Sequence, residues 1–309
     1  MQRIVEITKE GAFLSVERGF LNVEIEKQLS QIPLDAIEAL LLATQGATIT
    51  TTLLSRLCDL GIPVVVCRDN YMPTGLLLQY EGFSMIPQRL TLQIEASLPL
   101  KKNIWKQIVS HKVANQKDVL FWAKRDCSDF DQLISHIGSG DPQNVEAQAA
   151  RKYWPRLFGD SFLRDTSSKN INGALNYAYA IIRAMVARKI VASGLNPALG
   201  IMHQSQRNAF CLVDDLMEPF RPCADYAVAF YFQEMNLLPQ QEFILSPAFK
   251  KWLIASLNMI TLMTVEGGSH LSRSMELYVN DYVTSLQNKK EGLCCAELKV
   301  ALNKLTNPC

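Results

Sequence analysis

The chain has 309 residues, of which 48% are hydrophobic and 20% charged, and its formal net charge at pH 7 is +1. This composition excludes a disordered tail, a collagen-like fibre and a small disulfide scaffold. Taken over the whole chain, the charge also argues against a strongly basic nucleic-acid binder. The length allows one large domain or two ordinary ones, each able to bury a core.

The first part of the chain has the alternating pattern of short antiparallel strands, with glycines between the runs. The continuous apolar run at 37–42 instead predicts a strand buried on both faces. A short helix with a threonine cap is expected at 53–60. The strands are expected at 3–7, 12–17, 21–25, 37–42, 63–67 and 75–78.

From about residue 88 the hydrophobic spacing becomes helical and stays so to the end of the chain. The fold class is therefore predicted to be α+β, with a small β-sandwich-like part at 1–90 followed by a larger all-α part at 91–309. The charge divides similarly, with a net of −4 over residues 1–95 and +5 over 96–309. The helical part is thus the better candidate for contact with a polyanion.

No export signal is expected, because the N-terminus carries an early acid and lacks an apolar core. The most apolar stretch, 252–265, is too short to span a bilayer. The eight cysteines contain no CxxC pair, so we expect free thiols in a reducing cytoplasm.

Polar residues concentrate between 141 and 225, within apolar helical patterns. Asp141 and Pro142 predict the N-cap and first position of a helix. Glu146, among alanines one turn later, either lies at a helix–helix seam or is a first-turn glutamate favoured by the helix dipole. Asn172 and Asn176 share a helical face. The first is interpreted as a cap of its helix, and the second either supports a catalytic group or contacts a phosphate.

A loop bracketed by glycine and proline ends in His203, which is either a structural imidazole or a functional one. Asp215 and Glu218 are three residues apart, so on a helix they share one face. Two carboxylates so placed repel one another unless a cation lies near them. Asp214 is rotated away from this face and is interpreted as a solvated surface acid.

Glu146, His203 and Glu218, supported by Asp215, would form a mixed oxygen and nitrogen site for Mg²⁺ or Mn²⁺. A hard metal held by carboxylates suits phosphodiester chemistry. From the residues alone the prediction is a metal-dependent enzyme that acts on nucleic acid or another phosphoester. Several polar side chains near the ligands are candidates for holding DNA phosphates. They are Arg151, Arg164, Asn176, Arg207 and Arg221.

Four segments, in this order, resemble the CRISPR-associated spacer-acquisition integrase, the catalytic subunit of the CRISPR adaptation complex, and most closely its type II-like branch. The segments are 141–151, 172–177, 194–203 and 215–222. The resemblance implies that residues 1–90 form a dimerisation domain and residues 91–309 the catalytic domain. It also implies the metal ligands Glu146, His203 and Glu218, with Asp215 as a further catalytic acid.

The partners implied by this resemblance are double-stranded DNA fragments, CRISPR repeat DNA, a second copy of the chain and the small partner subunit of the adaptation complex. Further accessory and effector proteins are possible, and no membrane is involved. The implied reaction is direct transesterification, in which the 3′-hydroxyl of a captured DNA fragment attacks a phosphodiester at the edge of the repeat. Two alternatives stay open: a free-standing, structure-selective, metal-dependent DNA endonuclease, and a non-catalytic scaffold that bridges DNA and a partner protein.

Overall fold

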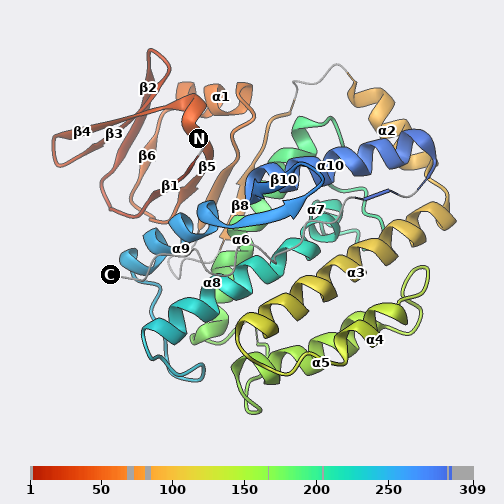
Figure 1. Ribbon diagram of the computed structural model, residues 1–309. Coiled ribbons are helices and arrows are strands. Elements are labelled where there is room, and N and C mark those ends of the chain that lie inside the picture. The colour runs from red at the N-terminus through yellow and green to blue at the C-terminus, as the bar shows by residue number, and fades with distance from the viewer. Residues whose placement is uncertain are drawn as a thin grey trace.

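A computed structural model describes residues 3–67, 73–80, 85–165, 167–203, 205–290 and 292–293. A β-rich N-terminal part lies beside a larger, mainly helical part, which confirms the predicted α+β class (Figure 1). The domain division proposed after residue 90 stays a prediction, and this position falls within helix α2, Ile86–Glu95.

The N-terminal part contains two four-stranded sheets. One has the order β1-β5-β7-β8, and the other has the order β4-β3-β2-β6. The first comprises β1 (Arg3–Ile7), β5 (Ile37–Leu42), β7 (Val64–Cys67) and β8 (Pro73–Leu77). The second comprises β4 (Gln28–Pro33), β3 (Phe20–Ile25), β2 (Phe13–Glu17) and β6 (Thr48–Ile49).

The expectation of antiparallel pairing holds for β2 with β3 but is wrong for β1, which pairs in parallel with β5. Parallel strands need a long connection, and the β2–β4 segment supplies it. The run at 37–42 is buried on both faces, as predicted. Leu40 and Leu42 belong to the small N-terminal core, whereas Ala39 and Leu41 face the large helical core.

Most of the remaining chain is helical. The helices are α1 (Thr51–Asp59), α2 (Ile86–Glu95), α3 (Leu98–Trp122), α4 (Phe130–Ser135), α5 (Val145–Phe158), α6 (Ile171–Ala192), α7 (Cys211–Leu216), α8 (Arg221–Glu234), α9 (Pro247–Met259) and α10 (Leu271–Asn288), with short 3-10 turns η1 (Leu34–Ala36) and η2 (Glu218–Phe220). One exception to the predicted all-α character is the antiparallel hairpin of β9 (Thr261–Thr264) and β10 (Gly267–His270). Its threonines and paired glycines favour a hairpin over a helix.

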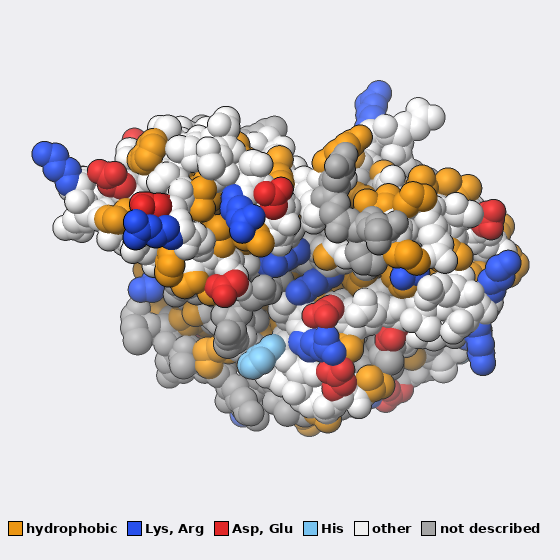
Figure 2. Space-filling model, turned by 90° about the horizontal axis from the view of Figure 1, so that it is seen from above, with side chains coloured by type: hydrophobic (Ala, Val, Ile, Leu, Met, Phe, Trp, Pro, Cys, Tyr) orange, Lys and Arg blue, Asp and Glu red, His pale blue; other side chains and the backbone are white. Residues whose placement is uncertain are grey.

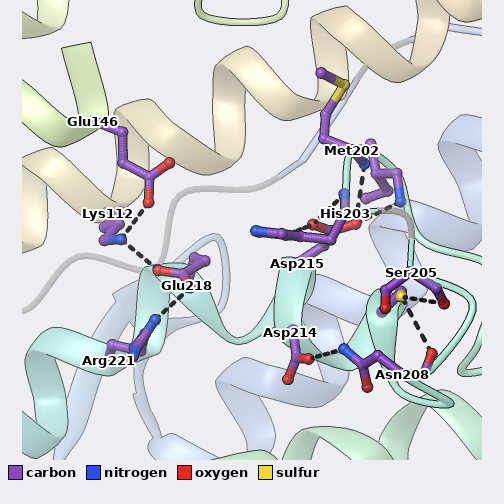
Figure 3. Close-up of polar contacts among 12 residues, drawn as sticks. Lys112, Glu146, Met202, His203, Ser205, Asn208, Asp214, Asp215, Glu218 and Arg221 are labelled. Atoms are coloured by element: carbon purple, nitrogen blue, oxygen red, sulfur yellow. Dashed lines mark hydrogen bonds and ion pairs between the residues drawn. The ribbon is translucent and has the colours of Figure 1, made fainter. Parts of the chain in front are cut away.

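The packing of α3 positions the site. Helix α3 packs against η2, α4, α5 and α8, and α6 packs against α8 and α10 within the large core. The start of α5 and the turn η2 are thereby brought to the same stretch of α3 (Figure 3).

No helix in the described ranges is both long enough and apolar enough to cross a membrane. The five cysteines within these ranges, Cys58, Cys67, Cys127, Cys211 and Cys223, are free thiols, as expected. The other three cysteines lie outside the described residues.

Candidate active site

Three separate segments carry the predicted metal ligands to one region of the structure. Glu146 lies in the first turn of α5, Glu218 begins η2, and His203 ends the loop that precedes α7. Their side chains point toward a shared region beside α3 (Figure 3). The negative charges of Glu218 and Glu146 contribute to raising the pKa of the His203 imidazole. The three residues therefore form one electrostatic cluster.

Lys112, on α3, lies between the two glutamates and was not singled out from the sequence. Its Nζ is 2.5 Å from Oε1 of Glu146 and 2.5 Å from Oε2 of Glu218. The helical spacing of the sequence could have indicated Lys112, because it shares a helical face with Ile108 and Gln116, which are both buried. A lysine on an otherwise buried face needs an anionic partner.

Glu218 is a buried carboxylate held by two cations. Its Oε1 accepts a hydrogen bond of 2.6 Å from Arg221. Burial would raise the pKa of Glu218, but the charges of Lys112 and Arg221 outweigh this effect and lower the pKa to about 2. The side chain is thus ionised at neutral pH. Its Oε2 has no hydrogen-bond partner, so its close contact with Lys112 is an ion pair without hydrogen-bond geometry.

Asp215 is completely buried and holds the loop that carries His203. Its Oδ2 accepts the backbone N–H groups of Ile201 (2.5 Å) and Met202 (3.1 Å), and its Oδ1 accepts that of His203 (3.3 Å). The same Oδ1 lies 2.5 Å from Nδ1 of the His203 ring. Asp215 therefore fixes both the backbone and the imidazole of His203.

The orientation of the His203 ring suits a ligand. A proton on Nδ1 is donated to Asp215, which leaves the lone pair of Nε2 for another partner. The ring extends from the loop toward the glutamates (Figure 3). Trp105 packs edge-on against it, with 5.5 Å between ring centroids. The hydrogen bond to Asp215 is the main reason that the pKa of His203 is raised.

The expectation that Asp215 and Glu218 share one helical face is wrong. Helix α7 ends at Leu216, and Glu218 begins a 3-10 turn. Pro219 has no N–H with which to continue the α-helical hydrogen bonds. Asp215 therefore faces the loop while Glu218 faces α3, and each carboxylate has its own partners.

Asp214 is not the solvated acid that was expected. Its Oδ1 accepts a 2.7 Å hydrogen bond from Nε of Arg183, and its Oδ2 accepts one of 2.6 Å from Asn208. Asp214 points away from Asp215, as predicted from helical rotation. Its carboxylate is only partly exposed, because Arg183 of α6 lies beside it.

The start of α5 also differs from the prediction. Asn144, with a positive φ of 52°, is the N-cap, and its side chain accepts from Ala147 N–H. Asp141 lies before the N-cap, but its carboxylate still accepts hydrogen bonds from the N–H groups of the first helical turn, those of Val145 (2.8 Å) and Glu146 (3.0 Å). These two hydrogen bonds fix the backbone at Glu146.

Among the predicted DNA contacts, the structure brings three together. Arg164 donates to Oδ1 of Asn172 (2.9 Å) and of Asn176 (2.5 Å). Both Arg164 and Arg221 lie over the ring of Tyr179, at 5.4 and 4.4 Å from its centroid. Asn172 is buried in the first turn of α6, which Asn170 caps.

The other two predicted DNA contacts, Arg151 and Arg207, are exposed and lie outside this group. On the face seen in Figure 2, basic and acidic side chains are interspersed among the coloured residues. Any DNA contact on that face would depend on local groups of cations rather than on one broad basic surface.

The chemical types of these donors suit a hard divalent cation, but their spacing in the structure does not. Within the described ranges, no three His, Cys, Asp or Glu side chains gather closely enough to hold a metal ion. The ammonium of Lys112 lies between the two carboxylates and serves as their cation. The carboxylate oxygens, one of them without a hydrogen-bond partner, and the nitrogen Nε2 are suitable ligands for Mg²⁺ or Mn²⁺.

Gly200 provides a test of the loop that carries His203. A Cβ at this position would overlap the carbonyl oxygen of His203 and lie 3.0 Å from Oδ2 of Asp215. We expect Gly200→Ala to lower the free energy of unfolding by roughly 2–3 kcal/mol, as overpacking does in closely packed sites. Urea denaturation measures this loss.

Gly173→Ala is the matched control for this prediction. Its Cβ would meet only Ser168 O, at 3.7 Å, and alanine favours the helix in which Gly173 lies. The control should be neutral or stabilising. Equal stability of Gly200→Ala and the wild type would contradict the close packing of the loop.

Comparisons with known proteins agree with this geometry. The family described as CRISPR associated protein Cas1 matches residues 5–255. A CRISPR-associated endonuclease Cas1 from Neisseria meningitidis serogroup C (strain 8013) is 36% identical over 82% of each chain. Among solved structures, a casposase bound to integration product has a TM-score of 0.81 at 19% identity and covers 99% of this chain and 96% of its own. A Cas6-RT-Cas1–Cas2 complex has a TM-score of 0.75 at 15% identity and covers 96% of this chain and 36% of that one.

Proposed function

Because this chain belongs to the CRISPR-associated Cas1 family, we propose that it is a DNA nuclease and integrase of CRISPR adaptation. The observation that carries the proposal is the convergence of Glu146 and Glu218 on one cation beside the His203 imidazole. Two carboxylates that share one buried cation beside an imidazole are the donor types that metal-assisted phosphodiester chemistry uses.

In the proposed site, Glu146, Glu218 and His203 would hold Mg²⁺ or Mn²⁺. When bound, such an ion polarises a phosphodiester and makes an attacking hydroxyl more acidic. Asp215 keeps the proton of His203 on Nδ1, so that Nε2 stays free to bind. Together with Lys112, Arg221 keeps Glu218 ionised.

The proposed attacking group is the 3′-hydroxyl of a captured double-stranded DNA fragment, and the target is a phosphodiester at the edge of CRISPR repeat DNA. The casposase of similar fold is bound to an integration product, which supports the joining reaction. The Cas1–Cas2 complex of similar fold supports a small partner subunit. A homodimer is part of the same proposal.

The proposal is tested by a half-site integration assay with the purified chain, the small partner subunit, a labelled duplex with 3′-hydroxyl ends and repeat DNA. We expect joined product with Mg²⁺ or Mn²⁺, none in EDTA, and recovery when Mn²⁺ is added in excess of the chelator. A duplex with 3′-deoxy ends is the control, because it is bound but lacks the attacking hydroxyl.

The two alternatives give different results in this assay. A free-standing endonuclease would cleave branched DNA without preference for the repeat, even with the partner subunit present. A non-catalytic scaffold would bind DNA equally well in EDTA and yield no product with either metal. Either result would replace the integrase proposal.

A further inference from the structure

Lys112 occupies the position that the proposed metal ion would need. We propose that Lys112 is the resident cation of this site in the metal-free protein, that it holds Glu146 and Glu218 in place, and that it must withdraw before a divalent ion binds. The inference rests on the proposed function, because it takes these carboxylates to be metal ligands. It assigns to Lys112 a positioning role that sets the metal affinity of the site.

The distances make the ammonium and a metal ion mutually exclusive. Nζ of Lys112 is 2.5 Å from one oxygen of Glu146 and 2.5 Å from one oxygen of Glu218. Mg²⁺ binds oxygen at about 2.0–2.1 Å. An ion in contact with both oxygens would therefore occupy the same volume as the nitrogen. Binding of a metal ion to these two oxygens therefore requires the departure of the ammonium.

Burial makes this competition strong. The side chains of Lys112 and Glu218 are 12% and 6% exposed, so little water screens the ion pair. Two ionised carboxylates left together without a cation would repel each other at this depth. The ammonium therefore lowers the free energy of the metal-free site and, to the same extent, weakens the binding of a metal ion.

The lysine side chain has space in which to withdraw. A cavity of about 110 Å³ adjoins it and is lined by Lys112, Gln116, Tyr179 and Asp225, among others. The four-carbon stem is flexible, and the ammonium is a compact charge. The wall of this cavity carries the carboxylate of Asp225 and also the guanidinium groups of Arg164 and Arg221, so it offers space rather than a net negative charge. Release of the two glutamates therefore does not require α3 to move.

Titration of the metal-free protein with Mn²⁺, followed by the paramagnetic resonance of the free ion, tests the inference. We expect Lys112→Met, which keeps an unbranched apolar stem and removes the ammonium, to bind Mn²⁺ at least tenfold more tightly than the wild type. Without metal its melting temperature should be lower than that of the wild type. The rise in melting temperature on addition of Mn²⁺ should be larger.

Lys117→Met is the matched control. Lys117 lies on the same helix and makes an ion pair of equal length, 2.5 Å, with Asp131, but the Asp131 side chain is 71% exposed. Removal of the Lys117 charge should leave the Mn²⁺ affinity within about twofold of that of the wild type, since exposed ion pairs contribute little to stability. Lys112→Gln is the second variant and should behave as Lys112→Met does.

The outcomes separate this inference from the proposed function. Mn²⁺ binding by Lys112→Met that is no tighter than that of the wild type would overturn the role of Lys112 alone. A wild-type protein that binds no Mn²⁺ would overturn the proposed metal site. Variants that unfold without metal and refold with Mn²⁺ would support the inference, because the ion then replaces the missing ammonium. Variants that stay unfolded with Mn²⁺ would contradict it.

Discussion

Glu218→Gln is expected to abolish metal-dependent joining, with a loss of at least about a thousandfold in rate. The change keeps the shape of the side chain but removes the charge of the most buried proposed ligand. A neutral amide binds Mg²⁺ or Mn²⁺ more weakly than a carboxylate. It also leaves Lys112 and Arg221 with one anionic partner fewer. Single-turnover joining with excess protein measures the loss.

Glu276→Gln is the matched control for this prediction. Glu276 pairs with Arg273 three residues earlier, at 2.8 Å, and Glu218 pairs with Arg221 three residues later, at 2.6 Å. Only in the second pair is the carboxylate buried. The control should join DNA at the wild-type rate. Because a broken buried pair also costs stability, both variants are compared well below their melting temperatures. Wild-type joining by folded Glu218→Gln would remove Glu218 from the site.

The sequence allowed prediction of those site residues whose neighbours are local. Asp215 and His203 lie twelve residues apart, and a loop bracketed by glycine and proline connects to a short helix between them. Glu146 stands in the first turn of a helix, as its flanking residues indicated. That these segments meet was inferred from residue types that suit a common metal and from the family resemblance, not from any local pattern.

Lys112 could not be placed in the same way, because its role depends on contacts across the fold. Its carboxylate partners are 34 residues away, in α5, and more than a hundred away, in η2. Only the packing of α3 against both elements creates the cluster. The sequence could show that a lysine stood on a buried face, but not which anions it would meet.

The same difference between local and distant contacts explains the errors in the fold. Alternation of residues shows which faces of a strand are buried but not which strand it pairs with. The strand β1 was therefore correctly located, whereas its parallel pairing with β5 was not predicted. The run at 37–42 was interpreted correctly because a strand buried on both faces is apolar at nearly every position, and this can be seen in the sequence.

Asp215→Asn is expected to lower the free energy of unfolding by about 3 kcal/mol and to reduce joining by about a hundredfold. The carboxylate accepts hydrogen bonds on both oxygens, from Ile201 and Met202 on one side and from His203 on the other. An amide has one acceptor oxygen, so its NH₂ group must face N–H donors on one side. Denaturation in urea and the single-turnover joining rate measure the two losses.

The pH dependence distinguishes this role from a purely structural one. Asp215 is the main cause of the raised pKa of His203. Stability from the ionised pair is complete below the ordinary histidine pKa, near 6.5, and is lost as the pH rises through the raised value. The stability difference between the wild type and Asp215→Asn should therefore be largest below about pH 6 and shrink toward alkaline pH, where the loss of the backbone hydrogen bonds remains.

Metal binding should shift with pH in the same variant. A metal ion competes with the proton for the imidazole, so Mn²⁺ affinity falls as the pH is lowered. Because the pKa of His203 is raised, this fall should begin at a higher pH in the wild type than at an ordinary histidine site. In Asp215→Asn this loss should move to lower pH, while the affinity at high pH falls because the ring is no longer oriented. Asp214→Asn, which removes the partly exposed partner of Arg183, is the control and should leave the pH profile unchanged. An unchanged profile in Asp215→Asn would show that Asp215 holds the loop without tuning the imidazole.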